Sequence, residues 1–408
     1  MSAQPRRVPA AARQRGQATL LVVLLVGVGI VLFAYNAVQS TSLTLERDRI
    51  TANALAQARQ ALIGRAVADN LRPGSLPCPD IDNDGDAESP VAFSGVCPMY
   101  IGQLPWKTLG LPDLRDGEGE RLWYALSNNF LDFATAEPIN SDTRGNRTVH
   151  SQSTAVTLTT EAVAVVFAPG AVTGAQIRDT VLAMCPTTGI TILRNRCAAN
   201  YLEATGGANN AALNGAGPFI SASRTPSFND RLLVITTAEL MPPIEQRVAR
   251  ELRRILQNYR AGSGCACYPW ADTADGYSDT SSNEKNRGRI PLLGAAPNDW
   301  SDAGVTIPSW ILNNDWRLVT YYAVARNSLQ GGGGACSSGY CQDATLSVDL
   351  VPNKEVVLIM PGPAGVSGAH TSFPSNYFED PENNDHANDR YVTPSSTAYA
   401  RDRIYTIP

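Results

Sequence analysis

The chain has 408 residues, with 33 Lys and Arg against 38 Asp and Glu, and its formal net charge is −5. The first 16 residues hold four arginines and no acid, so the remainder of the chain carries a net charge of −9. An acidic body of this kind lacks the broad basic face that nucleic-acid binding needs, and we expect no nucleic-acid partner. The length suggests two globular units, and 33 Gly with 27 Pro predict many turns rather than a helical bundle.

An uncharged apolar run follows the basic N-terminal segment directly. The run extends from Ala18 to Ala34 and continues to Val38, which is just long enough for a helix that spans a bilayer. Because the positive charges precede it, the positive-inside rule places the N-terminus in the cytoplasm and the rest of the chain on the exported side. The sequence thus predicts a transmembrane helix at 17–38.

Three interpretations of this N-terminal region compete. A cleaved signal peptide is the commonest meaning of such a composition, but the small residues of Ala34-Tyr35-Asn36-Ala37 have the wrong spacing for a cleavage site. A plain uncleaved anchor is the second interpretation. The third comes from a resemblance: a short basic leader ending in Gly16, followed at once by an apolar helix that continues as an amphipathic one, resembles the type IV pilin-like prepilins and pseudopilins.

This resemblance implies cleavage after Gly16 by a prepilin peptidase and methylation of the new N-terminal residue, Gln17. The family usually has Phe at the first mature position and Glu at the fifth, where this chain has Gln17 and Leu21. The tip or initiating pseudopilins resemble this chain in that they also lack the Glu at the fifth mature position.

The resemblance also implies a function, partners and a location. The function is that of a minor pilin or pseudopilin, a structural subunit at the tip or initiation complex of a type IV pilus or type II secretion-like filament. Its partners would be the prepilin peptidase, other pilin or pseudopilin subunits and the inner membrane. The location would be a single pass through the inner (cytoplasmic) membrane, with the heads in the periplasm or on an extracellular filament.

One long helix is predicted from the apolar run to about Asn70. The segment from Thr19 onward contains no Pro, and Ala54, Ala58, Leu62 and Ala66 recur every four residues, as on one face of a helix. We expect the first half of this helix to lie in the membrane and the second half to pack on a head. Beyond it, residues 155–168 and 231–237 are rich in β-branched residues and predict strands.

The chain then repeats itself in outline. A capping-box spacing at 236–239 precedes a second predicted helix, from about Met241 to Arg260. Six short segments echo earlier ones in the same order. The echoing pairs are Leu76–Asp80 with Tyr268–Asp272, Leu104-Pro105 with Ile290-Pro291, Trp123–Leu126 with Tyr321–Val324, Val163–Ala168 with Val356–Met360, Asn200–Glu203 with Asn376–Glu379, and Asp230–Leu232 with Asp402–Ile404.

These patterns predict an α+β fold in which a long N-terminal pilin-type helix carries two tandem, similar heads, each a helix packed on an antiparallel sheet. The expected divisions are a leader at 1–16, the transmembrane helix at 17–38, a first head with its amphipathic helix at 39–237, and a duplicated second head at 238–408.

Eight cysteines in an exported chain suggest disulfides. Pairing of near neighbours in the sequence predicts three bridges, Cys78 with Cys97, Cys185 with Cys197, and Cys336 with Cys341. Cys265 and Cys267 remain, and because a bridge across a single residue is strained, a redox-active or alternative pairing stays open. No cysteine belongs to a CxxC motif or lies near a His, so we expect no zinc site.

An acidic loop is the one candidate metal site. Its alternating acids surround Gly85 as in the first half of an EF-hand-type calcium loop. These acids are Asp80, Asp82, Asp84 and Asp86. Glu88 occupies the ninth position of the pattern, but the twelfth, normally Glu, is Val91. Some pseudopilin heads bind calcium in acidic loops, which favours a calcium site, and the alternative is a solvated turn.

No catalytic motif is evident. The three histidines, His150, His370 and His386, lie in polar, turn-like contexts, and there is no nucleophile elbow, phosphate-binding loop or dinucleotide fingerprint. We therefore predict that the chain is not an enzyme. Two alternatives remain, a membrane-anchored or secreted adhesin and, less favoured, an exported hydrolase that uses paired acids.

Overall fold

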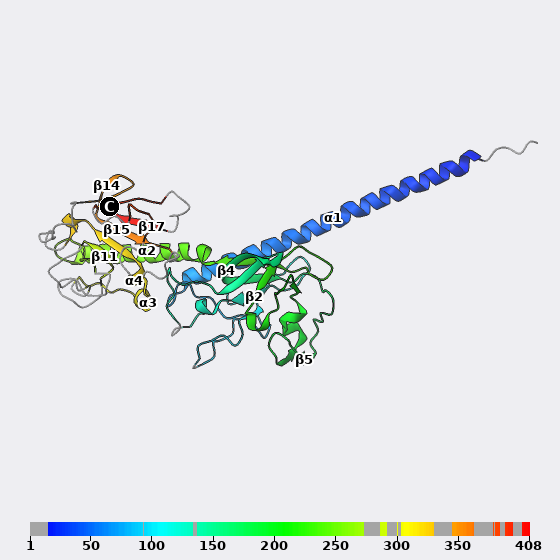
Figure 1. Cartoon of the computed structure of the whole chain (residues 1–408), viewed down its shortest axis with the longest axis horizontal. Helices are drawn as coiled ribbons and strands as arrows, with labels where there is room; N and C mark the ends of the chain where they lie inside the picture. The colour runs from blue at the N-terminus through cyan, green and yellow to red at the C-terminus, as the bar shows by residue number, and fades with distance from the viewer. Residues whose placement is uncertain are drawn as a thin grey trace, which may run out of the picture.

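A projecting helix and two sheet-rich units make up the computed structural model of the chain (Figure 1). The structure describes residues 15–92, 94–133, 137–272, 286–291, 300, 303–329, 345–362, 378, 380–383, 388–394 and 402–408, and between 15 and 41 it describes only the side chains of Leu24 and Val26. We call the part up to Thr236 the first unit and the part from Thr237 onward the second unit.

Helix α1 runs over Arg15–Ala68, and its C-terminal part packs on the first unit. Ala54, Ala58, Leu62 and Ala66, the residues predicted to form one face, are buried against β4, β10 and α2. Past the end of the helix, one carboxylate oxygen of Asp69 accepts the backbone N–H groups of Leu71 and Arg72, at 2.9 and 2.6 Å. These bonds hold the chain in the turn that leads away from α1.

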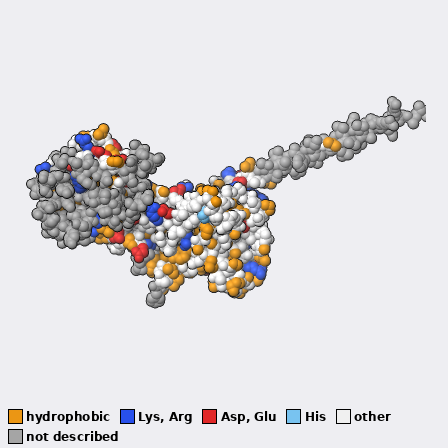
Figure 2. Space-filling model, viewed as in Figure 1, with side chains coloured by type: hydrophobic (Ala, Val, Ile, Leu, Met, Phe, Trp, Pro, Cys, Tyr) orange, Lys and Arg blue, Asp and Glu red, His pale blue; other side chains and the backbone are white. Residues whose placement is uncertain are grey.

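The first unit contains a six-stranded sheet in the order β1-β2-β4-β3-β9, with β10 also paired to β4. Its strands are β1 (Ile101–Gln103), β2 (Trp123–Leu126), β3 (Arg147–Ser151), β4 (Ser153–Ala168), β9 (Phe219–Ser221) and β10 (Arg231–Thr236). The strands predicted at 155–168 and 231–237 are confirmed as β4 and β10. Two short ribbons extend this unit, β5 (Leu182–Met184) with β6 (Thr191–Leu193) and β7 (Ala204–Thr205) with β8 (Ala208–Asn209). Around β5, Leu182 and Met184 are exposed, where Figure 2 shows hydrophobic side chains on the surface.

The second unit begins with helix α2 (Thr237–Gly262), whose existence the sequence predicts. It starts at the capping-box position and not near Met241, and Pro242 and Pro243 lie inside it. Its buried stripe covers a four-stranded sheet of β11 (Arg287–Arg289), β12 (Tyr321–Val324), β15 (Val356–Met360) and β17 (Arg403–Ile407). Helices α3 (Ser309–Asn313) and α4 (Trp316–Val319) and a sheet of β13 (Leu346–Val348), β14 (Val351–Lys354) and β16 (Arg390–Tyr391) complete the described part.

The two units share strand order, direction and register. In the first, β1, β2, β4 and β10 are neighbours in antiparallel pairs, as β11, β12, β15 and β17 are in the second. Tyr124 of β2 lies opposite Val166, and its counterpart Tyr322 of β12 lies opposite Leu358. Each of these two tyrosines also donates its buried hydroxyl to a proline carbonyl, at 3.3 Å to Pro77 and 2.8 Å to Pro269. The echoing segments that the structure describes therefore occupy matching places, while their origin by duplication stays a prediction. The segment Asn376–Glu379 lies, apart from Phe378, outside the described residues.

The predicted pilin-type fold class is wrong. The described part is sheet-rich, and of its four α-helices only α1 and α2 are longer than five residues. Among the residues that the structure describes, no helix combines the length and the apolar composition needed to cross a membrane.

This finding contradicts the transmembrane helix at 17–38, the assignment to membrane proteins and the single-pass inner-membrane location. In the described part of α1 beyond that span, Glu46, Arg47, Asp48 and Arg49 place four charges on consecutive positions, and charges of this density are too costly inside a bilayer. Apart from Leu24 and Val26, the side chains of 17–38 lie outside the described residues.

A buried carboxylate links the two units. Glu245 of α2 is fully buried, its carboxylate bonds Arg403 of β17, and Ser141 of the first unit donates its hydroxyl to Glu245 at 2.8 Å. Asn314 adds a second polar link, because its side chain accepts the N–H of Ile139 at 3.2 Å. The junction is therefore held by polar contacts of fixed geometry as well as by a shared apolar core.

Removal of the buried carboxylate tests this junction. Glu245→Ala removes the carboxylate that the guanidinium of Arg403 and the hydroxyl of Ser141 contact. Breaking a buried pair in this way costs about 3 kcal/mol. Urea denaturation should show this loss in the free energy of unfolding. Glu251→Ala is the control, because Glu251 pairs on the same helix with the more exposed Arg254 and its loss should cost under ~1 kcal/mol. Equal effects of the two substitutions would contradict the role of Glu245.

Candidate functional site

The candidate site is the loop from Asp80 to Glu88, in the first unit. Asp80 forms an antiparallel bridge with Gln103 at the end of β1, through N···O contacts of 3.0 and 2.7 Å. At Gly85, φ is +92° and a Cβ would lie 2.6 Å from the indole of Trp106, so this turn requires glycine. The sheet edge on one side and Trp106 on the other therefore set the shape of the loop.

Asp80 organises the loop from inside. Its side chain is buried, and its two carboxylate oxygens accept the backbone N–H groups of Asn83 at 2.6 Å and Gly85 at 2.7 Å. Asp82 is exposed and accepts the N–H of Asp84 at 3.1 Å. The sequence of alternating acids thus folds locally into side-chain-to-backbone turns.

Three carboxylates of the loop lie close enough to share a metal ion. Asp80, Asp82 and Glu88 each offer an oxygen, and these oxygens lie within 4.8 Å of one another. Glu88 also accepts the N–H of Ile81 at 3.3 Å, which turns it toward the loop. The sequence prediction named Asp80, Asp82, Asp84 and Asp86, and Glu88 was missing from that set although it holds the ninth position of the calcium-loop pattern.

Asp84 and Asp86 lie outside this cluster. The carboxylate of Asp84 accepts the N–H of Asp86 at 2.8 Å. Asp86 faces the ammonium group of Lys107 at 3.5 Å. The structure therefore brings together two of the four predicted acids with Glu88 and directs the other two elsewhere.

Burial and negative charge act together at the cluster. Burial raises the pKa of Asp80, the N–H groups of Gly85 and Asn83 partly oppose this, and the neighbouring acids raise it further. The pKa of Glu88 is raised by burial first and then by Asp82, Asp80 and Asp84. A bound cation would relieve this repulsion, since it favours the ionised form of each ligand.

The donor set fits a hard cation. Calcium takes six to eight oxygen ligands from carboxylates, carbonyls and water, and these residues supply only carboxylate oxygens. Three carboxylates would make up part of such a shell, with carbonyl and water oxygens needed for the rest. The buried, doubly hydrogen-bonded Asp80 suits this role better than proton transfer to a substrate.

The second unit also buries an acid at the position of Asp80, but pairs it with a positively charged side chain. Asp272 holds the place of Asp80, because it forms the equivalent bridge with Arg289 of β11. Its buried carboxylate accepts a hydrogen bond from the guanidinium of Arg317 at 2.8 Å. In the first unit, the nearby Arg121 bonds Asn83 and Asp113 instead of Asp80. In the second unit, the positive charge of Arg317 thus lies beside Asp272. In the first unit, Asp80 has other acids as its neighbours instead.

The remaining predicted site residues are distributed through the chain. Bridges join Cys78 to Cys97 and Cys185 to Cys197, with Cα–Cα distances of 5.5 and 5.6 Å, and a third joins Cys265 to Cys267. The predicted pair Cys336 and Cys341 lies outside the described residues. Gly16 and Gln17 belong to the first turn of α1, and their side chains also lie outside the described set.

The chain was compared with protein families, curated proteins and solved structures. No protein-family model, curated protein or solved structure matches the chain. The candidate site is therefore argued from its geometry alone.

We propose calcium as the ion of the acidic loop, and its removal tests this. Calcium at about 100 times its dissociation constant would add about 2.7 kcal/mol to the free energy of unfolding, and a chelator should abolish the gain. Calorimetry should show a higher melting temperature with calcium than with chelator.

Two exposed aspartates of the same loop provide the matched variants. Asp82→Asn removes a carboxylate of the cluster and should remove most of the calcium-dependent gain in melting temperature. Asp86→Asn removes the same charge outside the cluster and should leave the gain intact. Equal melting of the unmodified chain with calcium and with chelator would refute the site.

Proposed function

We propose that the chain is a low-copy structural subunit of a pilin- or pseudopilin-like filament and not an enzyme. The observation that carries this proposal is the part of α1 that extends beyond the first unit (Figure 1). Helix α1 has 54 residues, and among its side chains that the structure describes the first buried one is Thr51. A helix that leaves its own domain in this way offers its surface to other subunits.

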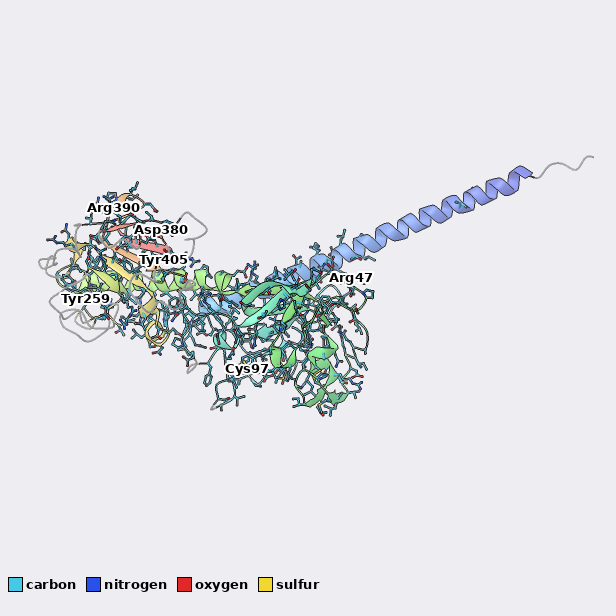
Figure 3. All side chains as sticks on the ribbon, viewed as in Figure 1. Arg47, Cys97, Tyr259, Asp380, Arg390 and Tyr405 are labelled. Carbon is cyan, nitrogen blue, oxygen red and sulfur yellow. A yellow bond between two sulfur atoms is a disulfide. The ribbon has the colours of Figure 1, made fainter. Side chains whose placement is uncertain are left out.

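Charged contacts set the direction in which α1 leaves the body. Arg47 pairs with Glu118 at 3.2 Å, and Asp48 pairs with Arg231 of β10 at 3.1 Å. Arg47 lies at the edge of the first unit, where α1 begins to project (Figure 3). The helix is thus held in a defined orientation at its point of exit.

Apolar side chains lie on the helix just beyond this point. Leu43 is 61% exposed and Leu45 is 64% exposed, so neither belongs to the core of the part of the chain that the structure describes. Burying one such side chain contributes about 1.5–3 kcal/mol. A helix within a protein also gains most of its stability from packing against other elements. Association with the helices of neighbouring subunits would both bury these leucines and provide the packing that stabilises the helix.

The second unit supports a position at the end of an assembly. It lies at the opposite end of the body from the projecting helix (Figure 1). Arg247 of α2 donates hydrogen bonds to the carbonyls of Val67 and Asp69, so the second unit covers the C-terminal end of α1. A further subunit stacked on that side would meet this second unit. This geometry suits a tip or initiating subunit better than a repeating one.

Substitutions on the projecting helix test the proposed packing surface. Leu43→Asp with Leu45→Asp should lower the amount of this chain in sheared filaments about 100-fold or more, because two apolar contacts worth about 3–6 kcal/mol are lost. Leu71→Asp is the control, since Leu71 is 68% exposed but lies beyond the end of α1. Quantitative mass spectrometry of filaments gives the amounts. Unchanged incorporation of the double variant would contradict the proposal.

The same filaments test processing and copy number. After cleavage by a prepilin peptidase, the incorporated chain should begin at Gln17, and its amount should be far below that of the main subunit. An N-terminus at Met1 or near Ala37 would refute the processing step. An amount comparable to the main subunit would refute the tip position.

A further inference from the structure

An arginine-lined groove runs along the exposed face of α2, away from the acidic loop. Its volume is about 610 Å³, and its walls are formed by α2 and by Trp310 of α3. The positively charged residues of the wall are Arg247, Arg250, Arg253 and Arg254, and Glu251 is the one acid. These positions face away from the buried stripe of α2, which includes Val248, Leu252 and Ile255.

Two of the four arginines are already engaged. Arg247 bonds the end of α1 and lies over the ring of Trp310, at 5.1 Å from its centroid. Arg254 donates a hydrogen bond to Glu251 at 3.0 Å. These contacts fix one wall of the groove and neutralise its acid.

The other two arginines have no partner in the part of the chain that the structure describes. Arg250 is exposed, and it makes no ion pair or hydrogen bond there. The Nε atom of Arg253 is buried and lacks a hydrogen-bond acceptor. The two guanidinium groups therefore leave the groove with positive charge that no described acid neutralises, and a carboxylate from outside the chain could pair with them.

We infer that this groove binds a short acidic segment of a partner protein. Guanidinium groups bind carboxylates through paired, charge-assisted hydrogen bonds, and Trp310 offers an apolar wall for the aliphatic parts of such a segment. A short peptide needs only the groove. A nucleic acid needs an extended basic surface, which a chain of net charge −5 disfavours. The inference goes beyond the proposed filament role and does not involve the projecting part of α1.

Fluorescence anisotropy with the full chain tests this inference. The probe is a labelled hexaglutamate peptide, compared with a labelled hexaglutamine peptide and a labelled six-nucleotide single strand. Hexaglutamate should bind at low ionic strength and weaken as salt is added, while hexaglutamine should not bind.

Arg250→Ser with Arg253→Ser should weaken hexaglutamate binding at least about tenfold. Arg250→Lys with Arg253→Lys keeps the charge but loses the planar donor geometry. Its affinity for hexaglutamate should therefore lie between those of the unmodified chain and the double serine variant. Arg49→Ser with Arg390→Ser is the matched control, because both residues are exposed and lie outside the groove. Arg49 belongs to α1, and Arg390 belongs to β16 of the second unit (Figure 3). Equal melting temperatures establish that the variants are folded.

Four results would overturn the inference. They are absence of hexaglutamate binding, equal binding of hexaglutamine, an equal loss in the control pair, and tighter binding of the nucleotide strand. The filament experiment is independent, since it reads incorporation through Leu43 and Leu45.

Discussion

The packing of α2 between the two units is the interaction on which the rest of the structure depends. This helix contacts β4 and β10 of the first sheet, β15 and β17 of the second, and α1. One apolar core therefore continues from the first unit to the second. Within it, the fully buried Glu245 makes its polar contacts to both units, through Ser141 and Arg403. A change at this helix would disturb both sheets at once.

The two units solve one electrostatic problem in two ways. Asp80 and Asp272 hold the same place beside equivalent strands, and both are buried. Arg317 provides the positive charge in the second unit, whereas the first unit places Asp82 and Glu88 near the acid. The internal ion pair shows what this backbone position needs when its acid is ionised. A cation from solution would play the corresponding part in the first unit, which is why the loop is our candidate metal site.

The proposed functions use surfaces that the shared core leaves exposed. The projecting part of α1 presents Leu43 and Leu45 at one end of the body. The outer face of α2 presents Arg250 and Arg253 at the groove. In α1 the C-terminal part packs in the core and the projecting part would meet partners, whereas in α2 the inner face packs in the core and the outer face would meet them. The two surfaces are separate, so each proposal stands or fails independently.

Local patterns in the sequence determined the elements, and long-range packing decided the site. The four-residue spacing of Ala54 to Ala66 and the β-branched run of β4 act within their own segments, so periodicity was sufficient to predict them. The ion pair of Arg317 with Asp272, 45 residues apart, depends on how distant segments meet. Which acids of the loop approach Asp80 depends on the shape of the folded loop, which brings Glu88 near and leaves Asp84 and Asp86 out. The membrane-spanning helix was wrongly inferred from composition alone. Burial and charge pairing are properties of the folded chain, and only the tertiary structure could decide them.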